Sequence, residues 1–396
     1  MGQSNFTQNC SFPQLSFPVI AAELKNFSFE QALQHYDLLP ASLLGTAQRI
    51  GRRVPHVIQT SLIAALEAWQ QAKLFTRSIE NQRFGLVVAG HNTTQRYHYN
   101  LYTAFQQEPS YLSPTYALHF MDTDQVGTLS EVFNIHGEGY TVGAASASGN
   151  AGILHGYRLI QQDLVDYCMV VGVLPDLSPM ELQGFYNIGA LGGKSFQHDP
   201  SKACRPFDHK HEGFIWGQAC GCLILESSSK AAQDKISPLG EIVGAALTLD
   251  GNRLSQPSQA GETRTMERAL VDANMLPGDI QYINTHGSSS VLGDETEVNA
   301  IHAVFGKHTP DIWLNSTKSL IGHCLWAAGI VEAIAVLLQL QESFLHPNRN
   351  LDNPIDTGCR FVGDHSEAAV IQTAMSNSFG FGGINTSLIF THNTRC

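Results

Sequence analysis

The segment that decides the fold is Thr141-Val142-Gly143-Ala144-Ala145-Ser146-Ala147-Ser148-Gly149-Asn150-Ala151-Gly152. It joins a β-prone run at 139–142 to apolar residues at helical spacing in 153–160, so we predict a strand, a tight turn and a helix. Small residues at such a turn let backbone N–H groups approach a ligand closely. We expect Ser146 to start the helix, where unpaired amides and the helix dipole favour negative charge. In the alternative interpretation, Ser146 or Ser148 only caps the helix.

Apolar runs on both sides of this segment indicate a parallel sheet. Residues 84–90 and 167–173 are continuously apolar, as in strands that are covered on both faces. The alternation of strands and helices starts again after residue 235, which predicts an α/β fold with two similar halves, 1–235 and 236–396. The further expected strands are 217–226, 241–247, 280–284 and two within 373–391. The expected helices are one or two within 43–74, and 227–234, 262–273, 294–305 and 325–340.

Composition and charge limit the class of protein. The 396 residues are 43% hydrophobic, as in globular proteins, and the net charge of −12 argues against nucleic acid as the main partner. The eight cysteines lack C-x-x-C spacing, which is typical of a reduced, intracellular enzyme. We find no signal-peptide pattern and no uninterrupted apolar segment of membrane-spanning length, and therefore expect a soluble cytoplasmic protein that does not bind membranes.

Four stretches carry reactive residues at the predicted ends of strands, where α/β sheets place their sites. They contain Ser146, His286, Lys318 with His323, and the glycine-rich loop 379–383. Each stretch alone is a weak signal, because a histidine after a strand usually has a structural role. No carboxylate or thiolate at ligand spacing accompanies the two histidines, so we expect no metal site.

Taken together and in this order, six segments resemble the β-ketoacyl synthases (ketosynthases), a branch of the thiolase-fold superfamily. The resemblance extends over about residues 18–391. It implies a thiolase-like layered αβαβα fold of two duplicated halves, working as a homodimer. It also implies a substrate carried as a thioester on the phosphopantetheine arm of an acyl carrier protein, with no other cofactor. The six segments are Thr141–Ser148, Cys204–Asp208, Thr285–Ser290, Gly293–Glu297, Ser316–His323 and Asn377–Gly383.

The resemblance implies a role for each candidate catalytic residue. In the family, a nucleophilic cysteine takes an acyl group, and two histidines and a lysine surround it. The histidines assist the decarboxylation of a malonyl thioester. The matching residues here are His286, His323 and Lys318. The backbone N–H groups of Ser146 and Phe381 match the family's oxyanion hole.

The resemblance also implies contacts with the carrier protein. Ser288 and Ser290 match positions where the family often has threonines that contact the pantetheine arm. Arg49, Arg52 and Arg53 lie where family members dock the acidic carrier. Without the resemblance, this arginine cluster is equally consistent with a solvated helix face.

The sequence departs from the family at the nucleophile, where Ser146 replaces the cysteine. A hydroxyl needs a general base, which the histidine pair is not thought to supply, so we expect no covalent acyl-enzyme. Stabilisation of an enolate oxygen needs no nucleophile. Serine-containing relatives occur in polyketide β-branching cassettes, where they supply acetyl-carrier to a hydroxymethylglutaryl-synthase-like partner. The resemblance therefore predicts a malonyl-ACP decarboxylase.

Two other functions stay open. One is a condensing ketosynthase that uses Ser146 as a slow nucleophile, and the other is a non-catalytic relative that only binds carrier proteins. Cys324 is a conceivable replacement thiol, although core packing is the favoured interpretation. Gln218 stands where the family usually has an acidic residue. Family members also place a first strand, expected to be central in the fold, ahead of residues 17–20, and we do not find it. A shortened start or a different pairing of residues 1–17 would explain this.

Overall fold

The computed structural model describes residues 6–9, 12 and 15–392, which form two mixed sheets with the same strand order. In each sheet, three neighbouring strands are parallel and the next strand is antiparallel. The two halves therefore share one topology. In the first sheet the order is β4 (Gly139–Val142), β3 (Phe84–Ala89), β5 (Tyr167–Gly172) and β7 (Gly221–Glu226), and in the second it is β10 (Trp313–Asn315), β9 (Tyr282–Asn284), β14 (Thr373–Gly380) and β15 (Ile384–Thr391), with β12 (Arg360–Phe361) and β8 (Glu241–Leu249) at the edges.

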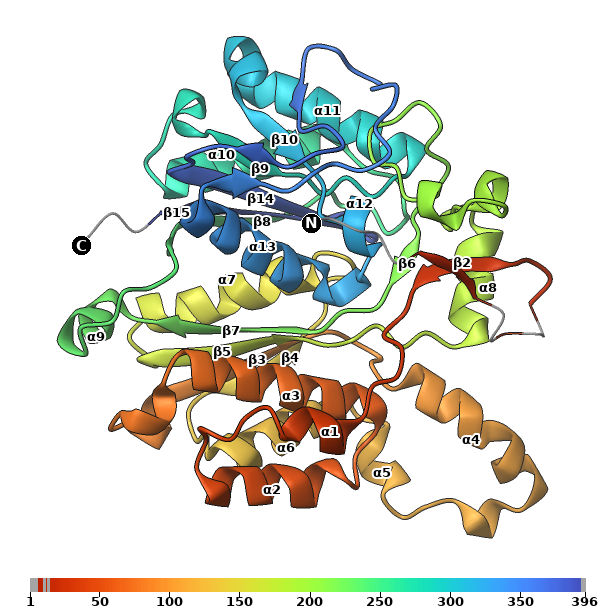
Figure 1. The fold of residues 1–396 in the computed structure, drawn as a ribbon, viewed down its shortest axis with the longest axis vertical. Coiled ribbons are helices and arrows are strands. Elements are labelled where there is room, and N and C mark those ends of the chain that lie inside the picture. The colour runs from red at the N-terminus through yellow and green to blue at the C-terminus, as the bar shows by residue number, and fades with distance from the viewer. Residues whose placement is uncertain (1–5, 10–11, 13–14, 393–396) are drawn as a thin grey trace.

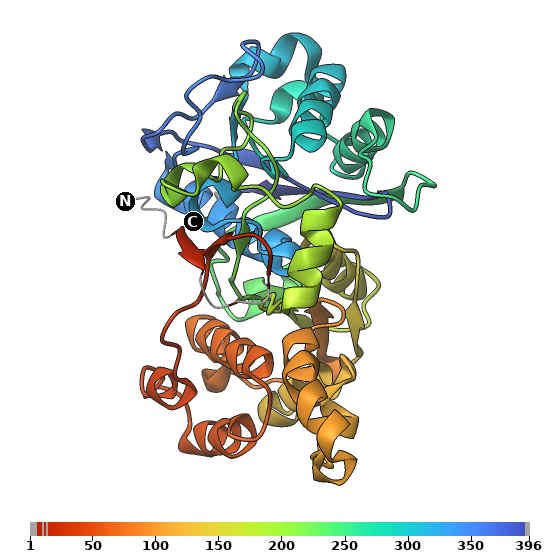
Figure 2. The same ribbon diagram turned by 90° about the vertical axis from the view of Figure 1, so that its right-hand side faces the viewer.

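Helices separate and cover the two sheets, which confirms the layered αβαβα fold (Figures 1 and 2). One pair lies between the sheets, a second pair covers the outer face of the first sheet, and a third pair covers the outer face of the second. The inner pair is α7 (Ser148–Gln161) and α13 (Ala328–Glu342), and the outer pairs are α3 (His56–Gln71) with α6 (Thr123–Phe133) and α10 (Gln259–Asp272) with α11 (Val291–Phe305).

The remaining elements connect or border these layers. A small sheet lies beside the layers, and the shorter helices lie mainly in the first half. The predicted division at 235/236 falls between the last helix of the first half and β8, and it stays a prediction. The small sheet contains β1 (Thr7–Asn9), β2 (Val19–Ala22) and β6 (Trp216–Gly217), and the other elements are α1 (Phe29–Leu33), α2 (Ala41–Gly51), α4 (Gln95–Gln107), α5 (Tyr116–His119), α8 (Pro179–Asn187), α9 (Ser228–Gln233), α12 (Lys318–Ile321), β11 (Phe344–Leu345) and β13 (Glu367–Ala368).

The sequence patterns locate the core strands because continuous apolar runs are buried on both faces. Every residue of β3 and β5 is buried. The helix at 325–342 is long and apolar enough to span a membrane by length and composition, contrary to our expectation that no segment would be. However, 67% of this segment is buried inside the fold, since α13 is an inner helix. Its apolar character is that of a core helix.

The expectation that the family's first strand is central needs correction. The first strand of the second half, β8, lies at a sheet edge, antiparallel to β15. The equivalent edge of the first sheet is β7, which pairs only with β5 among the described residues. The family's first strand, which is not found among the described residues of the first half, therefore has its counterpart at an edge. In the early part of the chain, Thr7–Asn9 instead pairs with β2.

The two inner helices cross at backbone contact. A Cβ atom at Gly149 of α7 would lie 2.6 Å from the backbone nitrogen of Ile330 and 2.7 Å from that of Gly329 in α13. Cβ atoms do not approach other heavy atoms this closely, so any side chain at Gly149 would force the helices apart. Because these two helices form the layer between the sheets, their crossing fixes the distance between the two sheets.

We predict that Gly149→Val lowers the free energy of unfolding by about 3 kcal/mol, because the added side chain overpacks this crossing. Chemical denaturation of the purified variant measures the change. The matched control is Gly127→Ala, on the exposed face of α6, where a Cβ atom meets nothing within 4 Å. This control should be neutral or stabilising by up to about 1 kcal/mol. Equal effects of the two substitutions would contradict the prediction.

Candidate active site

The turn before α7 differs in detail from the predicted helix start. The helix begins at Ser148, so Ser146 lies two residues before it, after Ala145 in the left-handed region (φ 47°). The Ser148 hydroxyl accepts from the Ala144 N–H at 2.8 Å and donates to the Ala145 carbonyl at 2.7 Å. Ser148 therefore holds the turn together. Within the described residues, the Ser146 hydroxyl makes no hydrogen bond.

The hairpin between β14 and β15 packs against this turn. A Cβ atom at Gly380 would lie 2.5 Å from the carbonyl oxygen of Ala144, so only glycine allows the approach. The next residue, Phe381, is thereby brought to the turn that carries Ser146. Neither the Ser146 nor the Phe381 backbone N–H donates to another described group. Both amides remain available to an oxyanion, although this role stays a prediction.

Two buried carboxylates of α11 position the loop that carries His286. Glu297 accepts from the backbone N–H groups of His286 and Gly287, both at 2.8 Å. Asp294 accepts from the N–H of Ser289 at 3.1 Å. Burial raises the pKa of Glu297 to about 7. The motif Gly293–Glu297 thus has a clear structural role, since it fixes the backbone on either side of the histidine.

The structure brings His286, His323 and Lys318 together. The two imidazole rings are edge to face, with centroids 5.5 Å apart. The Lys318 ammonium donates to the His286 carbonyl at 2.6 Å and lies 3.5 Å from its Nδ1. His323 Nδ1 accepts from the Leu325 N–H at 3.0 Å. The ring of Phe379, from the hairpin, lies 5.7 Å from that of His286.

These contacts determine the protonation of both histidines. Burial is the main cause that lowers the pKa of His286 and His323 well below the usual value, and the Lys318 charge lowers both further. The two rings are therefore neutral at pH 7. Because each Nδ1 faces a hydrogen-bond donor, the proton lies on Nε2 in both rings. The site presents two neutral N–H donors and has no free imidazole base.

Glu332 is the functional residue that the sequence analysis missed. It lies on α13, with a side chain only 1% exposed, and its Oε1 is 2.5 Å from Lys318 Nζ. The ion pair holds the ammonium beside His286. A signal was available in the sequence, because Glu332 is the only charged residue in the apolar segment 325–340. A charge buried in such a helix needs a partner.

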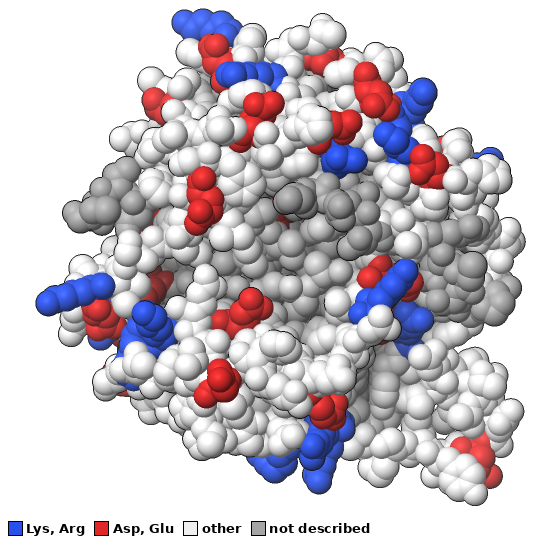
Figure 3. All heavy atoms as spheres, in the orientation of Figure 1, with Lys and Arg blue, Asp and Glu red and all other residues white. Residues whose placement is uncertain are grey.

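The residues expected to contact the carrier are not joined to this cluster by any described contact. Ser288 and Ser290 share a hydrogen bond of 2.9 Å on the loop after His286. Arg49 and Arg52 form exposed ion pairs with Glu131 and Glu30, which are weak in water. Arg53 has no ion pair within the described part of the chain. Basic side chains lie over α2 at the lower end of the face in Figure 3. The carrier roles stay predictions.

The structure explains two residues that the sequence analysis singled out, Cys324 and Gln218. Cys324 is 1% exposed, and burial raises its pKa to about 12, so it is an unreactive thiol at neutral pH. Gln218 accepts from the Leu24 N–H at 3.0 Å and donates to Asp176 at 3.3 Å. A carboxylate at this position could not make the second bond.

Comparison with known proteins identifies the family. Residues 18–231 match the β-ketoacyl synthase N-terminal domain, and residues 239–352 match the β-ketoacyl synthase C-terminal domain. The chain belongs to the β-ketoacyl synthase family. It is 40% identical over 377 residues to the polyketide biosynthesis malonyl-ACP decarboxylase PksF of Bacillus subtilis (strain 168), covering 95% of this chain and 86% of that protein. It is 31% identical over 379 residues to 3-oxoacyl-[acyl-carrier-protein] synthase 2 of Staphylococcus aureus, covering 94% of this chain and 89% of that protein.

Solved structures of ketosynthases have the same fold. A β-ketoacyl synthase from Burkholderia phymatum STM815 superposes with a TM-score of 0.86, at 25% identity, covering 99% of this chain and 93% of that one. A type II polyketide ketosynthase in complex with its acyl carrier protein superposes with a TM-score of 0.83, at 23% identity, covering 99% and 93%. The thiolase-like fold of this ketosynthase relative is thus established.

We predict that His286 and His323 stay neutral, with the proton on Nε2, at about pH 6.5, where a free imidazole is half protonated, because burial and the Lys318 charge lower their pKa values. Long-range ¹⁵N–¹H NMR spectra of histidine-labelled protein measure both properties, and His286→Asn and His323→Asn assign the signals. Denaturation in urea is the control, since both rings should then titrate near pH 6.5. The prediction would be refuted if either folded-state signal titrated near pH 6.5, or if either ring carried its proton on Nδ1.

Proposed function

We propose that this protein decarboxylates malonyl-ACP to acetyl-ACP in polyketide biosynthesis. The observation that carries the proposal is a ketosynthase site with two neutral N–H donors and a serine that has no base. PksF, at 40% identity, is a malonyl-ACP decarboxylase by name, which supports the same activity here. The reaction uses no cofactor besides the phosphopantetheine arm that carries the substrate.

The two histidines act on the thioester oxygen. His286 and His323 donate from Nε2 to the carbonyl of the malonyl thioester. The bond between the carboxylate and Cα breaks, CO₂ leaves, and the electron pair moves into an enolate whose negative oxygen the donors stabilise. Each preorganised donor of this kind lowers the activation barrier by about 3 kcal/mol. Cα then takes a proton from solvent water, which gives the acetyl thioester.

A condensing reaction through Ser146 is disfavoured. Attack by a hydroxyl requires a base within hydrogen-bond reach. The unprotonated nitrogen of His323 is occupied by the Leu325 N–H, and that of His286 faces the Lys318 ammonium. In our proposal, Ser146 therefore contributes its backbone N–H, together with that of Phe381, and its side chain is not acylated.

The proposal extends to partners. The acidic carrier protein docks on Arg49, Arg52 and Arg53, and its pantetheine arm contacts Ser288 and Ser290. The enzyme acts in the cytoplasm, and a hydroxymethylglutaryl-synthase-like enzyme of a β-branching cassette uses the acetyl-carrier that it forms.

The enzyme is proposed to work as a homodimer that pairs through β4. This strand is the edge of the first sheet and, unlike β3 and β5, none of its residues is buried. Exposed strand edges are natural sites for pairing with a second copy.

We predict that the purified protein converts malonyl-ACP to acetyl-ACP and CO₂ without becoming acylated. Intact-mass spectrometry of both proteins follows the reaction. His286→Ala or His323→Ala should slow it by at least about 100-fold, because each removes one oxyanion donor. Ser146→Ala should slow it by less than about tenfold, because the backbone N–H remains.

Three outcomes separate the candidate functions. Unchanged malonyl-ACP would overturn the proposal in favour of a carrier-binding relative. An acyl adduct on Ser146, lost in Ser146→Ala, would indicate a condensing enzyme. Ser146→Cys supplies a nucleophile that needs no base, so a folded variant should be acylated by acyl thioesters.

We predict that charge reversal at Arg49, Arg52 and Arg53 raises the KM for malonyl-ACP by about tenfold at low salt, because it weakens attraction to the carrier. The kcat should change little, since none of these residues belongs to the cluster around His286. Steady-state kinetics on the triple Glu variant measure the effect. Arg268→Glu, an exposed arginine on α10, is the matched control. An equal rise in KM for this control would contradict the docking site.

A further inference from the structure

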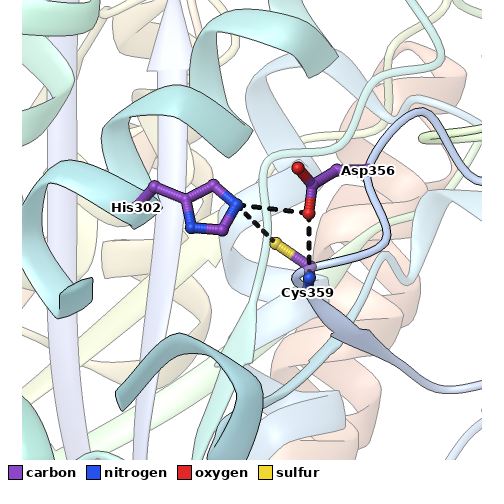
Figure 4. A group of neighbouring side chains, drawn as sticks. All are labelled: His302, Asp356 and Cys359. Carbon is purple, nitrogen blue, oxygen red and sulfur yellow. Dashed lines mark hydrogen bonds and ion pairs between the residues drawn. The ribbon is translucent and has the colours of Figure 1, made fainter. Parts of the chain in front are cut away.

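A second cluster of reactive side chains lies at the outer layer of the second half. His302 is in the last turn of α11, and Asp356 and Cys359 are in the loop before β12 (Figure 4). Their ligand atoms lie within 4.8 Å of one another, and no other group of three such side chains does so in the part of the chain that the structure describes. His302 is five residues beyond Glu297, a rotation of about 140° around the helix, so it faces away from the His286 loop.

The three side chains converge on one point. Asp356 Oδ1 is 3.2 Å and Cys359 Sγ is 3.7 Å from the same atom, His302 Nε2. In a nucleophile relay the thiol and the carboxylate contact opposite ring nitrogens, so this cluster cannot act as one. A metal ion instead needs several ligand atoms that lie close together, and this cluster offers a nitrogen, an oxygen and a sulfur atom.

The spacing of the donor atoms fits a tetrahedral zinc ion. Bonds of about 2.0 Å to nitrogen and oxygen and about 2.3 Å to sulfur, at tetrahedral angles, separate N from O by ~3.3 Å and N from S by ~3.5 Å. The observed separations are 3.2 and 3.7 Å. A thiolate, an imidazole and a carboxylate favour Zn²⁺ over Mg²⁺ or Ca²⁺, which prefer oxygen ligands.

The backbone holds the ligands in place. Two backbone N–H groups, of Gly358 and Cys359, donate to Asp356 Oδ1 at 2.8 Å, which holds the oxygen that faces His302 in place. A Cβ atom at Gly358 would lie 3.1 Å from the His302 ring, so glycine lets the loop approach the helix. The side chains of His302 and Asp356 are 36% and 27% exposed, which gives an ion and a fourth, water ligand access.

We propose that His302, Asp356 and Cys359 bind a Zn²⁺ ion that fastens the loop at 352–359 to α11. The ion has a structural effect, because the same loop supports Phe207 in the segment 204–208, which contacts α11 beside the His286 loop. Ile355 donates to the Phe207 carbonyl at 2.8 Å, and Phe207 in turn donates to Asp294 at 2.7 Å. The site is independent of the proposed decarboxylation, and its test needs no turnover.

The test uses full-length, tag-free protein that has been stripped with a chelator and dialysed against Zn²⁺ or Co²⁺. We expect about one Zn²⁺ per chain by elemental analysis, and a thiolate-to-Co²⁺ charge-transfer band that Zn²⁺ displaces. Cys359→Ser should abolish the band, and His302→Ala should weaken Zn²⁺ binding by at least about tenfold. Asp356→Asn should also weaken binding, while its amide oxygen can still accept the two loop hydrogen bonds.

Matched controls separate this site from others. Cys222→Ser removes a part-buried cysteine of β7, and His365→Ala removes an exposed histidine of the same half. Both variants should bind Zn²⁺ and Co²⁺ as the parent protein does. Circular dichroism shows whether each variant is folded. Substoichiometric binding by the parent protein, or binding retained in all three site variants, would overturn the proposal.

Discussion

The buried ammonium of Lys318 is the constraint on which the site depends. Taking a charge out of water costs several kcal/mol, so its position is fixed by the partners that compensate it. Those partners are Glu332 on α13 and His286 after β9, and the lysine itself is on α12. Three elements of the second half are thereby tied together at one atom. Burial is the main cause that lowers the pKa of both imidazoles, and the same charge lowers it further, so Lys318 acts on the protonation state as well as on the geometry.

The turn at Ser146 has retained its backbone rather than its side-chain chemistry. Ala145 is in the left-handed region, which costs on the order of 1 kcal/mol for a residue with a Cβ atom. The Ser148 hydroxyl and the close approach of Gly380 hold this conformation. What the conformation provides is an unpaired amide at Ser146. A ketosynthase turn has two separable properties, the nucleophile and the backbone donor; Ser146 replaces the first, and the second stays a prediction.

Much of the fold was predictable because its signals are local. The apolar runs of β3 and β5 and the hairpin around Gly380 follow directly from the sequence pattern. The position of the missing strand was not predictable, because the order of strands depends on long-range pairing. For the same reason the His302 cluster escaped notice, since 54 residues separate His302 from Asp356 and no spacing marks them. The first residue of α7 was misplaced by two positions, because Ser148 bonds within the turn. Glu332 was recognisable, as a lone charge in an apolar helix.

The unequal edges of the two sheets have a consequence for assembly. The second sheet ends in β8 and β12, whereas the first ends in β4 and in β7, whose outer edge no described strand covers. The position beside β15 is filled by β8, whereas the equivalent position beside β7 is filled by no described strand. Pairing of two chains through β4 would leave the β7 edge of each chain without a strand partner among the described residues. Glu226 is the charged residue of β7, and it is already paired with Arg77. A charged side chain on an edge strand disfavours pairing with the strand of another chain, and Glu226 is such a residue on β7.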